Sequence, residues 1–304
     1  MMAAPDAPPV ARPAIGRGLA LATLGAVAFS AKAIIVKLAY RYGVDAVTLI
    51  MYRMLFALPL FAALAWWAGR GRPPLGRRDL ADVALLGFLG YYLASFLDFA
   101  GLAYITASLE RLILYTNPAL VLALGWALHG ERVTARQATA IGISYVGVLA
   151  VFGQEASLEG ADVALGSALV LGGALSYAAY LVMSGSVVKR LGALRLTGWA
   201  TSVACVLCIA QFMLLRPLEA AQVAPEVIWL SLLNATLCTF VPVLAVMMAI
   251  ERVGATLTAQ AGMIGPLATV AMGVWLLDEP FTASVALGTG LVLAGVWWLA
   301  RERR

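Results

Sequence analysis

The sequence is poor in the residues that catalysis and metal binding use most. Its 304 residues include one histidine, His129, and three cysteines, and only 12% are charged. About a quarter of the residues in a soluble domain are charged, so this composition indicates a membrane protein. A lone histidine does not make a metal site, and no Ser-His-Asp set, Walker loop or dinucleotide fingerprint occurs. We therefore expect that the protein is not an enzyme and that it binds no metal and no cofactor.

The cysteines give no sign of redox chemistry. Cys205 and Cys208 form a C-x-x-C within one apolar run, and Cys238 lies in another. No polar residues flank the pair and no second pair exists, so we interpret all three as small helix-packing residues. The net charge of +5 does not indicate nucleic-acid binding, because the basic residues are scattered over loops.

Apolar residues are abundant: they make up 62% of the chain, and the mean hydropathy is +0.91. About 20 apolar residues in a helix cross a bilayer, so the pattern predicts an all-α polytopic membrane protein with ten transmembrane helices. The predicted spans are residues 16–39, 46–69, 80–101, 107–129, 134–153, 163–188, 194–215, 226–250, 254–277 and 282–300. Residues 1–15, rich in proline and alanine, are expected to form a disordered tail; the alternative is part of a cleaved secretory signal.

The stretch 107–148 returns later in the chain. Shifted by 148 residues, 13 of its 42 positions are identical to those of 255–296, where roughly four matches are expected by chance. Glu131 and Glu279 are one of the matched pairs. The repeat predicts two five-helix halves, residues 16–153 and 163–300. A repeated membrane segment that carries polar residues indicates a transporter.

Loop charges predict how the halves are oriented. With a cytoplasmic N-terminus, fifteen basic residues lie at the inner face and only Lys37, Arg41 and Arg216 at the outer face. The positive-inside rule therefore places both termini in the cytoplasm. Glu131 then lies in an inner loop and Glu279 in an outer loop, so the two repeats are inverted. Inverted repeats are typical of alternating-access carriers, which bind substrate near the midplane.

Several short motifs of the sequence carry a resemblance to a known family. They are Asp45–Arg53 (DAVTLIMYR), Ala107–Arg111 (ASLER), Asn117-Pro118, Glu131-Arg132, Gly142 and Gly147, echoed at Pro266, Glu279, Thr282, Gly290 and Gly295. The chain resembles the EamA family of the drug/metabolite transporter superfamily over nearly its whole length. The resemblance implies a ten-helix carrier, typically an exporter of small metabolites, amino acids or drugs. In one departure, the second half has no ionisable residue deep in its spans.

Five ionisable residues fall within spans of the first half: Lys32, Arg53, Asp98, Glu110 and Arg111. A charge at a helix centre costs about 2.5–3.5 kcal/mol, so unpaired, lipid-facing placements are unfavourable. We expect Lys32 to pair with Asp98, and the adjacent Glu110 and Arg111 to face different sides. In one interpretation this pair is purely structural and the other three snorkel or cap helix ends. In the other, the group binds a charged or zwitterionic substrate, with Asp98 or Glu110 as proton carrier.

Two spans carry polar-aromatic stripes. Tyr91 and Ser95 are spaced to share a helix face with Asp98, and Tyr177 and Tyr180 belong to a similar stripe on the sixth span. If the stripes face each other, they line a cavity for an organic substrate. The alternative is that the tyrosines simply pack between helices.

Pro118 and Pro266 occupy matching positions in the middle of their spans. A proline there removes a backbone hydrogen bond and favours a kink, which leaves a carbonyl free to face a cavity. Asn117, which we include among the substrate-binding candidates, and Gly265 are their neighbours. A hinge is therefore predicted in both spans, with a kink needed only for packing as the alternative.

Together these features predict a secondary carrier in a bacterial-type cytoplasmic membrane, a monomer or homodimer. It would export a small polar or amphipathic metabolite by alternating access, with proton coupling or exchange. An uptake carrier, or a carrier of a sugar conjugate, is the alternative. A membrane enzyme would need a nucleophile with its base or a metal cluster, and a scaffold would gain nothing from duplicated polar spans.

Overall fold

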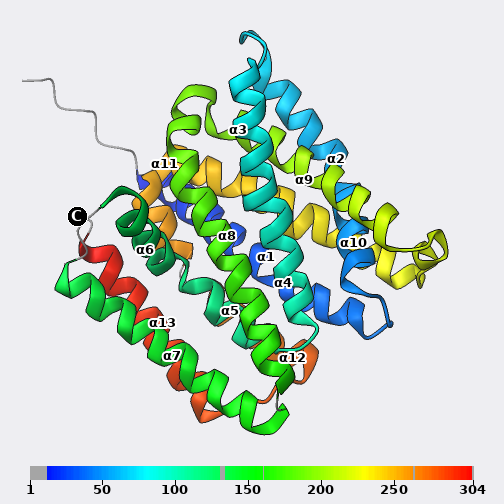
Figure 1. Cartoon of the computed structure of the whole chain (residues 1–304). Coiled ribbons are helices and arrows are strands. Elements are labelled where there is room, and N and C mark those ends of the chain that lie inside the picture. Colours follow the sequence, from blue (N-terminus) through cyan, green and yellow to red (C-terminus); the bar gives the residue numbers. More distant parts are fainter. Residues whose placement is uncertain (1–11, 131–133, 160, 263, 303–304) are drawn as a thin grey trace, which may run out of the picture.

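The computed structural model describes residues 12–130, 134–159, 161–262 and 264–302, which form helices joined by short connections, with no β-strand among them (Figure 1). The N-terminal half contains α1 (Arg12–Tyr40), α2 (Ala46–Gly69), α3 (Arg77–Gly87), the π-helical turn η1 (Phe88–Leu93), α4 (Ala94–Leu102), α5 (Ala107–Tyr115), α6 (Asn117–His129) and α7 (Ala135–Glu159). The C-terminal half contains α8 (Ala161–Leu191), α9 (Ala193–Leu215), the short η2 (Leu218–Ala221), α10 (Pro225–Ala235), the π-helical turn η3 (Thr236–Phe240), α11 (Val241–Gly262), α12 (Ile264–Leu277) and α13 (Ala283–Glu302).

Eight helical stretches of the described residues are long and apolar enough to cross a membrane. They cover the predicted spans one to eight. Two shorter apolar helices, Ile264–Leu277 and Ala283–Trp298, occupy the places of the predicted ninth and tenth spans. Because α1 begins at Arg12, residues 12–15 of the predicted tail are helical, and residues 1–11 lie outside the described part.

The boundary predicted between spans 226–250 and 254–277 is wrong, because α11 stays helical from Val241 to Gly262. In the first half, the equivalent connection ends at Thr106, whose side chain caps α5 by accepting a hydrogen bond from the Leu109 amide (3.0 Å). The second half has Gly254 at the matching position. Without a capping side chain, nothing marks the start of a separate helix there.

The chain nevertheless reverses its direction between α11 and α12. Val253 of α11 lies against Gly18, near the start of α1. Further along the chain, the Gly265 carbonyl accepts a hydrogen bond from the Ser30 hydroxyl (3.0 Å), in the middle of α1. α11 therefore runs antiparallel to α1, whereas α12 runs parallel to α1.

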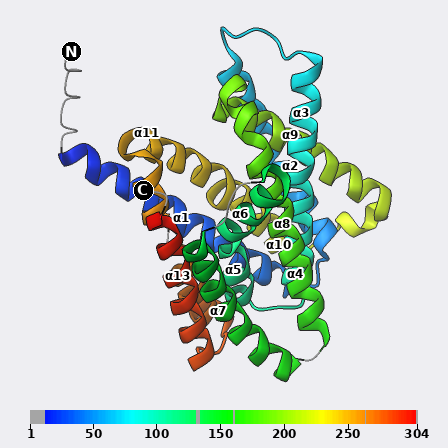
Figure 2. The ribbon, with the colours of Figure 1, turned by 60° about the vertical axis from the view of Figure 1, so that its left-hand side comes forward.

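Contacts between the halves repeat with both partners shifted by 148 residues. In α7 and α13, which lie side by side in Figures 1 and 2, Gly147 lies against Gly288, and their counterparts Gly295 and Ala140 also touch. A Cβ atom at position 147 would come within 2.7 Å of the Gly288 carbonyl oxygen. Glycine is therefore required for this close approach of two backbones.

The same shift relates the contacts of α1 and α8. Gly25 of α1 lies against Val246 of α11, and Gly173 of α8 lies against Asp98 of α4. The π-helical turns η1 and η3 also begin 148 residues apart, at Phe88 and Thr236. The two halves thus have equivalent packing, including the local irregularity of their third helices.

Equivalent helices in contact run antiparallel. Ala65, near the end of α2, lies against Gly198 at the start of α9, whereas Asp45 before α2 pairs with Arg216 after α9 (3.1 Å). A twofold axis along the helices would make such a pair parallel. The antiparallel packing therefore indicates an axis perpendicular to the helices. We call the contact surface between the two halves the seam; it includes the Ala65–Gly198 contact of α2 and α9 and the Gly147–Gly288 contact of α7 and α13.

Candidate functional site

A buried charged triad lies among α1, α4 and α5. Lys32 Nζ is 2.5 Å from Asp98 Oδ2 and 3.1 Å from Glu110 Oε1. All three side chains are at least nine-tenths buried. The predicted Lys32–Asp98 pair is present, and Glu110 joins it as a second carboxylate. The chain turns back between α4 and α5, and this turn brings the two carboxylates to the same ammonium group.

Arg111 faces a different side of α5, as the sequence predicted for two adjacent residues. Its Nη2 donates to Ser30 Oγ (2.9 Å), and its guanidinium lies over the rings of Phe29 (5.5 Å) and Tyr115 (5.2 Å). The Ser30 hydroxyl also contacts the Gly265 carbonyl of α12. Arg111 therefore helps to join the first half to the second.

Arg53 of α2 also reaches across the seam. Its Nε and Nη2 donate to Thr239 Oγ1 in η3 (3.3 and 3.2 Å), and its guanidinium carbon lies 5.1 Å from the centre of the Phe99 ring. Only 6% of Arg53, none of Glu110 and 5% of Arg111 is exposed. This burial contradicts the alternative in which these three side chains snorkel to the ends of their spans.

Several buried polar atoms of these residues have no hydrogen-bond partner within the described part of the chain. They are Asp98 Oδ1, Glu110 Oε2, Arg53 Nη1, Arg111 Nε and Asn117 Oδ1, whereas Glu110 Oε1 pairs with the Lys32 ammonium. An unsatisfied buried polar group costs about 1–3 kcal/mol, and more when it is charged. Native proteins keep few such groups, and each calls for a water, a proton or a ligand as partner. The cluster thus has unused binding capacity.

The predicted tyrosine stripes do meet, but the rings fill the space between them. The hydroxyls of Tyr91 and Tyr180 are 3.1 Å apart with their rings edge to face, and Tyr177 stacks on Tyr180 (5.5 Å between ring centres). They pack in an apolar cluster with side chains of α3 and α9. This geometry fits the packing alternative.

Tyr91 and Asp98 were predicted to share a helix face, but they contact different neighbours. Tyr91 faces α8, whereas Asp98 faces Lys32 on α1. Tyr91 lies within the π-helical turn η1, which winds more residues into each turn than an α-helix and so shifts the face that follows. Ser95, one turn before Asp98, is half-buried.

The helix breaks lie close to both predicted hinges. α5 ends at Tyr115 with Thr116 as its C-cap, and Pro118 stands at the start of α6, where its missing amide hydrogen is not needed. Asn117, between them, is half-buried. In the second half α12 begins at Ile264, two residues before Pro266. A sequence pattern of prolines thus locates two interruptions of the helices, one in each half.

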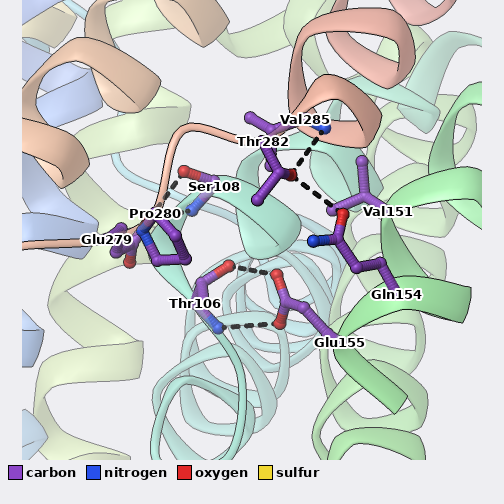
Figure 3. Close-up of a pocket in the computed structure, with 9 residues that line it drawn as sticks. All are labelled: Thr106, Ser108, Val151, Gln154, Glu155, Glu279, Pro280, Thr282 and Val285. Atoms are coloured by element: carbon purple, nitrogen blue, oxygen red, sulfur yellow. Dashed lines mark hydrogen bonds between the residues drawn. The ribbon is translucent and has the colours of Figure 1, made fainter. Parts of the chain in front are cut away.

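Two carboxylates that the sequence did not place in the site hold the N-terminus of α5 (Figure 3). Glu279 accepts hydrogen bonds from the Ala107 amide (2.6 Å) and from the Ser108 amide (3.2 Å) and hydroxyl (2.6 Å). Glu155 accepts from the Thr106 hydroxyl (2.5 Å) and amide (3.3 Å). The negative charges match the positive end of the helix dipole.

These carboxylates border a small cavity of about 60 Å³, lined by Thr106, Ser108, Val151, Gln154, Glu155, Glu279, Pro280, Thr282 and Val285. Such a volume accommodates a few waters, not a metabolite. The repeat could have pointed to Glu279, because it matches Glu131. Glu131 itself lies outside the described residues. We call the Glu279–Ala107–Ser108 contact the α5 latch.

Comparison with known proteins agrees with this architecture. The model of the EamA-like transporter family matches residues 16–153 and 164–301. The uncharacterized transporter YcbK of Bacillus subtilis (strain 168) is 29% identical over 278 residues, 88% of this chain and 87% of that protein. The uncharacterized transporter YetK of the same organism is 25% identical over 252 residues, 81% of this chain and 75% of that protein.

A solved crystal structure also resembles the chain in fold. It superposes with a TM-score of 0.61 at 16% sequence identity, over 95% of this chain and 99% of that one. The family match covers both halves, which confirms the resemblance found in the sequence. The chain therefore belongs to the EamA-like transporter family and is a membrane transporter with multiple apolar helices.

Proposed function

We propose that the protein is a secondary active carrier that exports a small polar or amphipathic metabolite across the bacterial cytoplasmic membrane by alternating access. The observation that carries the proposal is the buried cluster of Lys32, Asp98 and Glu110, with unpartnered acceptor atoms, beside a seam between two equivalent halves. Carriers built from inverted repeats bind their substrates at this place.

In the proposed topology the chain crosses the membrane ten times, with both termini in the cytoplasm. The distribution of basic loop residues supports this orientation. The α5 latch and its cavity then lie at the outer end, so the structure corresponds to a state closed to the outside. Opening would separate the N-terminus of α5 from Glu279 and give the triad access to the outer solution.

The triad suits proton coupling because two carboxylates share one ammonium group. When one carboxylate takes up a proton, the other still compensates Lys32, so no isolated charge is left buried. Asp98 Oδ1 and Glu110 Oε2 are also available to accept a hydrogen bond from a substrate. Proton and substrate would therefore compete for the same acceptor atoms, which is the condition for exchange.

The experiment is efflux from proteoliposomes loaded with a labelled metabolite panel, with and without a pH gradient. We expect Asp98→Asn and Glu110→Gln to lose most of the gradient-driven efflux. Asp162→Asn, which removes an exposed carboxylate at the start of α8, is the matched control and should keep it. Gradient-driven efflux at the wild-type rate in Asp98→Asn would exclude Asp98 as the proton carrier. Absence of any protein-dependent flux would exclude the carrier itself.

A further inference from the structure

Arg53 is a buried cation without a carboxylate partner. Within the described residues no acidic group lies within ion-pair distance of it, and Nη1 has no hydrogen-bond partner. Two of its N–H groups donate hydrogen bonds to one neutral hydroxyl, that of Thr239. Taking a charge out of water costs several kcal/mol unless good partners compensate it. The desolvation cost of the Arg53 charge is therefore not compensated by an ion pair.

The neighbouring charges do not cancel this one. The buried cluster holds three cations, Lys32, Arg53 and Arg111, and two carboxylates, both of which contact Lys32. With all five groups ionised, one positive charge is in excess, and protonation of a carboxylate increases the excess. Lys32 and Asp98 are close enough to Arg53 to interact with it electrostatically. The buried cluster of charged residues is thus complementary to an anion.

The fold itself does not require this charge. The position equivalent to Arg53 in the second half, 148 residues later, is Thr201, and the position equivalent to Lys32 is Tyr180. Thr239 itself corresponds to Tyr91, whose hydroxyl lies 3.1 Å from that of Tyr180. The second half therefore builds the same packing with uncharged residues. Packing of the fold therefore does not depend on the cations of the first half.

We propose that Arg53 and Thr239 form an anion subsite that binds a carboxylate group of the transported molecule. A guanidinium presents parallel N–H donors that match the two oxygens of a carboxylate, and it is desolvated more cheaply than an ammonium. Nη1 is the free donor, and the Phe99 ring holds the guanidinium plane from one side. Because Arg53 belongs to α2 and Thr239 to η3, the carboxylate binds where the two halves meet.

This inference rests on the proposed carrier function and narrows its substrate class to organic acids and zwitterions. A carboxylate at Arg53 supplies the missing negative charge of the cluster. An additional cationic group on the substrate would find acceptors at Asp98 Oδ1 and Glu110 Oε2. Purely cationic and uncharged metabolites leave Arg53 uncompensated, and the subsite disfavours them.

The first test uses formate as the probe, because it is the smallest carboxylate. The melting temperature of the detergent-solubilised protein is compared in sodium formate and sodium chloride at equal ionic strength. We expect formate to raise it by about 2 °C or more in the wild type and not in Arg53→Gln. Arg53→Lys should keep part of the rise, and Arg190→Gln, which removes a partly exposed arginine, should keep all of it. An equal rise in Arg53→Gln and wild type, or no rise in the wild type, overturns the subsite.

A structural role for Arg53 gives a different result in the same measurement. If the arginine mainly holds α2 against η3, Arg53→Gln should melt lower than wild type in chloride. If it is an anion subsite, removal of the uncompensated charge leaves the melting temperature in chloride unchanged or higher. Thr239→Val keeps the side-chain shape, so a weaker formate effect in this variant, without a loss of folding, supports a subsite shared by both residues.

The second test separates this inference from the carrier proposal. Proteoliposomes are loaded with gluconate, glucosamine or glucose, which share a carbon skeleton and differ in charge, and with a cell metabolite extract. We expect the transported compounds to carry a carboxylate, and their flux to fall tenfold or more in Arg53→Gln. Flux of compounds without a carboxylate, unchanged in Arg53→Gln, overturns the subsite while the carrier stands. No flux of any compound overturns the carrier.

Discussion

Glu279→Gln should open one end of the transporter without unfolding it. In the structure, the Glu279 carboxylate accepts three hydrogen bonds from the first residues of α5, two from backbone amides and one from the Ser108 hydroxyl. Glutamine has nearly the same shape but no charge, and its amide nitrogen cannot accept a hydrogen bond. The variant therefore removes part of a contact that exists only while this end is closed.

The size of the effect follows from the location of the carboxylate. A negative charge at a helix N-terminus is worth about 0.3–1 kcal/mol when exposed and up to ~2 kcal/mol when partly buried. Glu279 is half-buried. We therefore expect the closed state to lose about 1–2 kcal/mol, which corresponds to a roughly 5–30-fold shift toward the open state.

A cysteine in the same cavity reports the opening. Val285 lines the cavity and is 7% exposed, and the native cysteines are at most 2% exposed, so Val285→Cys should dominate labelling by a membrane-impermeant maleimide. Adding Glu279→Gln should speed the labelling by about 5–30-fold, whereas Glu219→Gln, which changes an exposed glutamate of η2, should not. An unchanged rate in Glu279→Gln, or equal acceleration in both, would refute the latch.

Three further predictions concern stability. Lys32→Met leaves two buried carboxylates without their cation, so we expect a loss of about 3–5 kcal/mol, seen as a lower melting temperature in detergent; unchanged melting would contradict the triad. Gly147→Ala should cost about 1–3 kcal/mol because the methyl group meets the opposite backbone, whereas Gly142→Ala, with open space around it, should be neutral in the same melting assay. Partial burial alone would raise the pKa of Asp45, but hydrogen bonds from Thr48 and a nearby arginine lower this pKa overall. The ionised carboxylate therefore stabilises the start of α2 above pH ~4 and loses this effect as the pH falls further, a dependence that acid titration of Asp45→Asn should lack.

The sequence predicted the main elements of the site because membrane burial restricts charged residues severely. Lys32 and Asp98 lie deep in their spans, so each needed a partner, and they are each other's. The repeat predicted equivalent halves, and the paired glycine contacts of α7 and α13 show that equivalence in space. The first inference depends on the cost of burying a charge, and the second on comparing the two halves of the chain. Both can be made from a single sequence.

The remaining features depend on geometry that one sequence does not reveal. The π-helical turns η1 and η3 have no sequence signature, yet η1, which contains Tyr91, gives Asp98 a different face from Tyr91, and η3 presents Thr239 to Arg53. Glu110 reaches Lys32 only because α4 and α5 form a tight hairpin. The boundary expected between residues 250 and 254 was wrong because Gly254 supplies no capping side chain and α11 continues to Gly262.

The central claim, that the triad faces the solution on each side of the membrane in turn, can be tested most directly with Ser95→Cys. This residue is half-buried and lies one turn before Asp98. A membrane-impermeant maleimide is applied to right-side-out and to inside-out vesicles that contain the variant. We predict labelling from both sides, slowed on one side when the α5 latch is locked by a cross-link. Labelling from neither side would show that the triad is a sealed structural ion pair, and would contradict the alternating-access carrier.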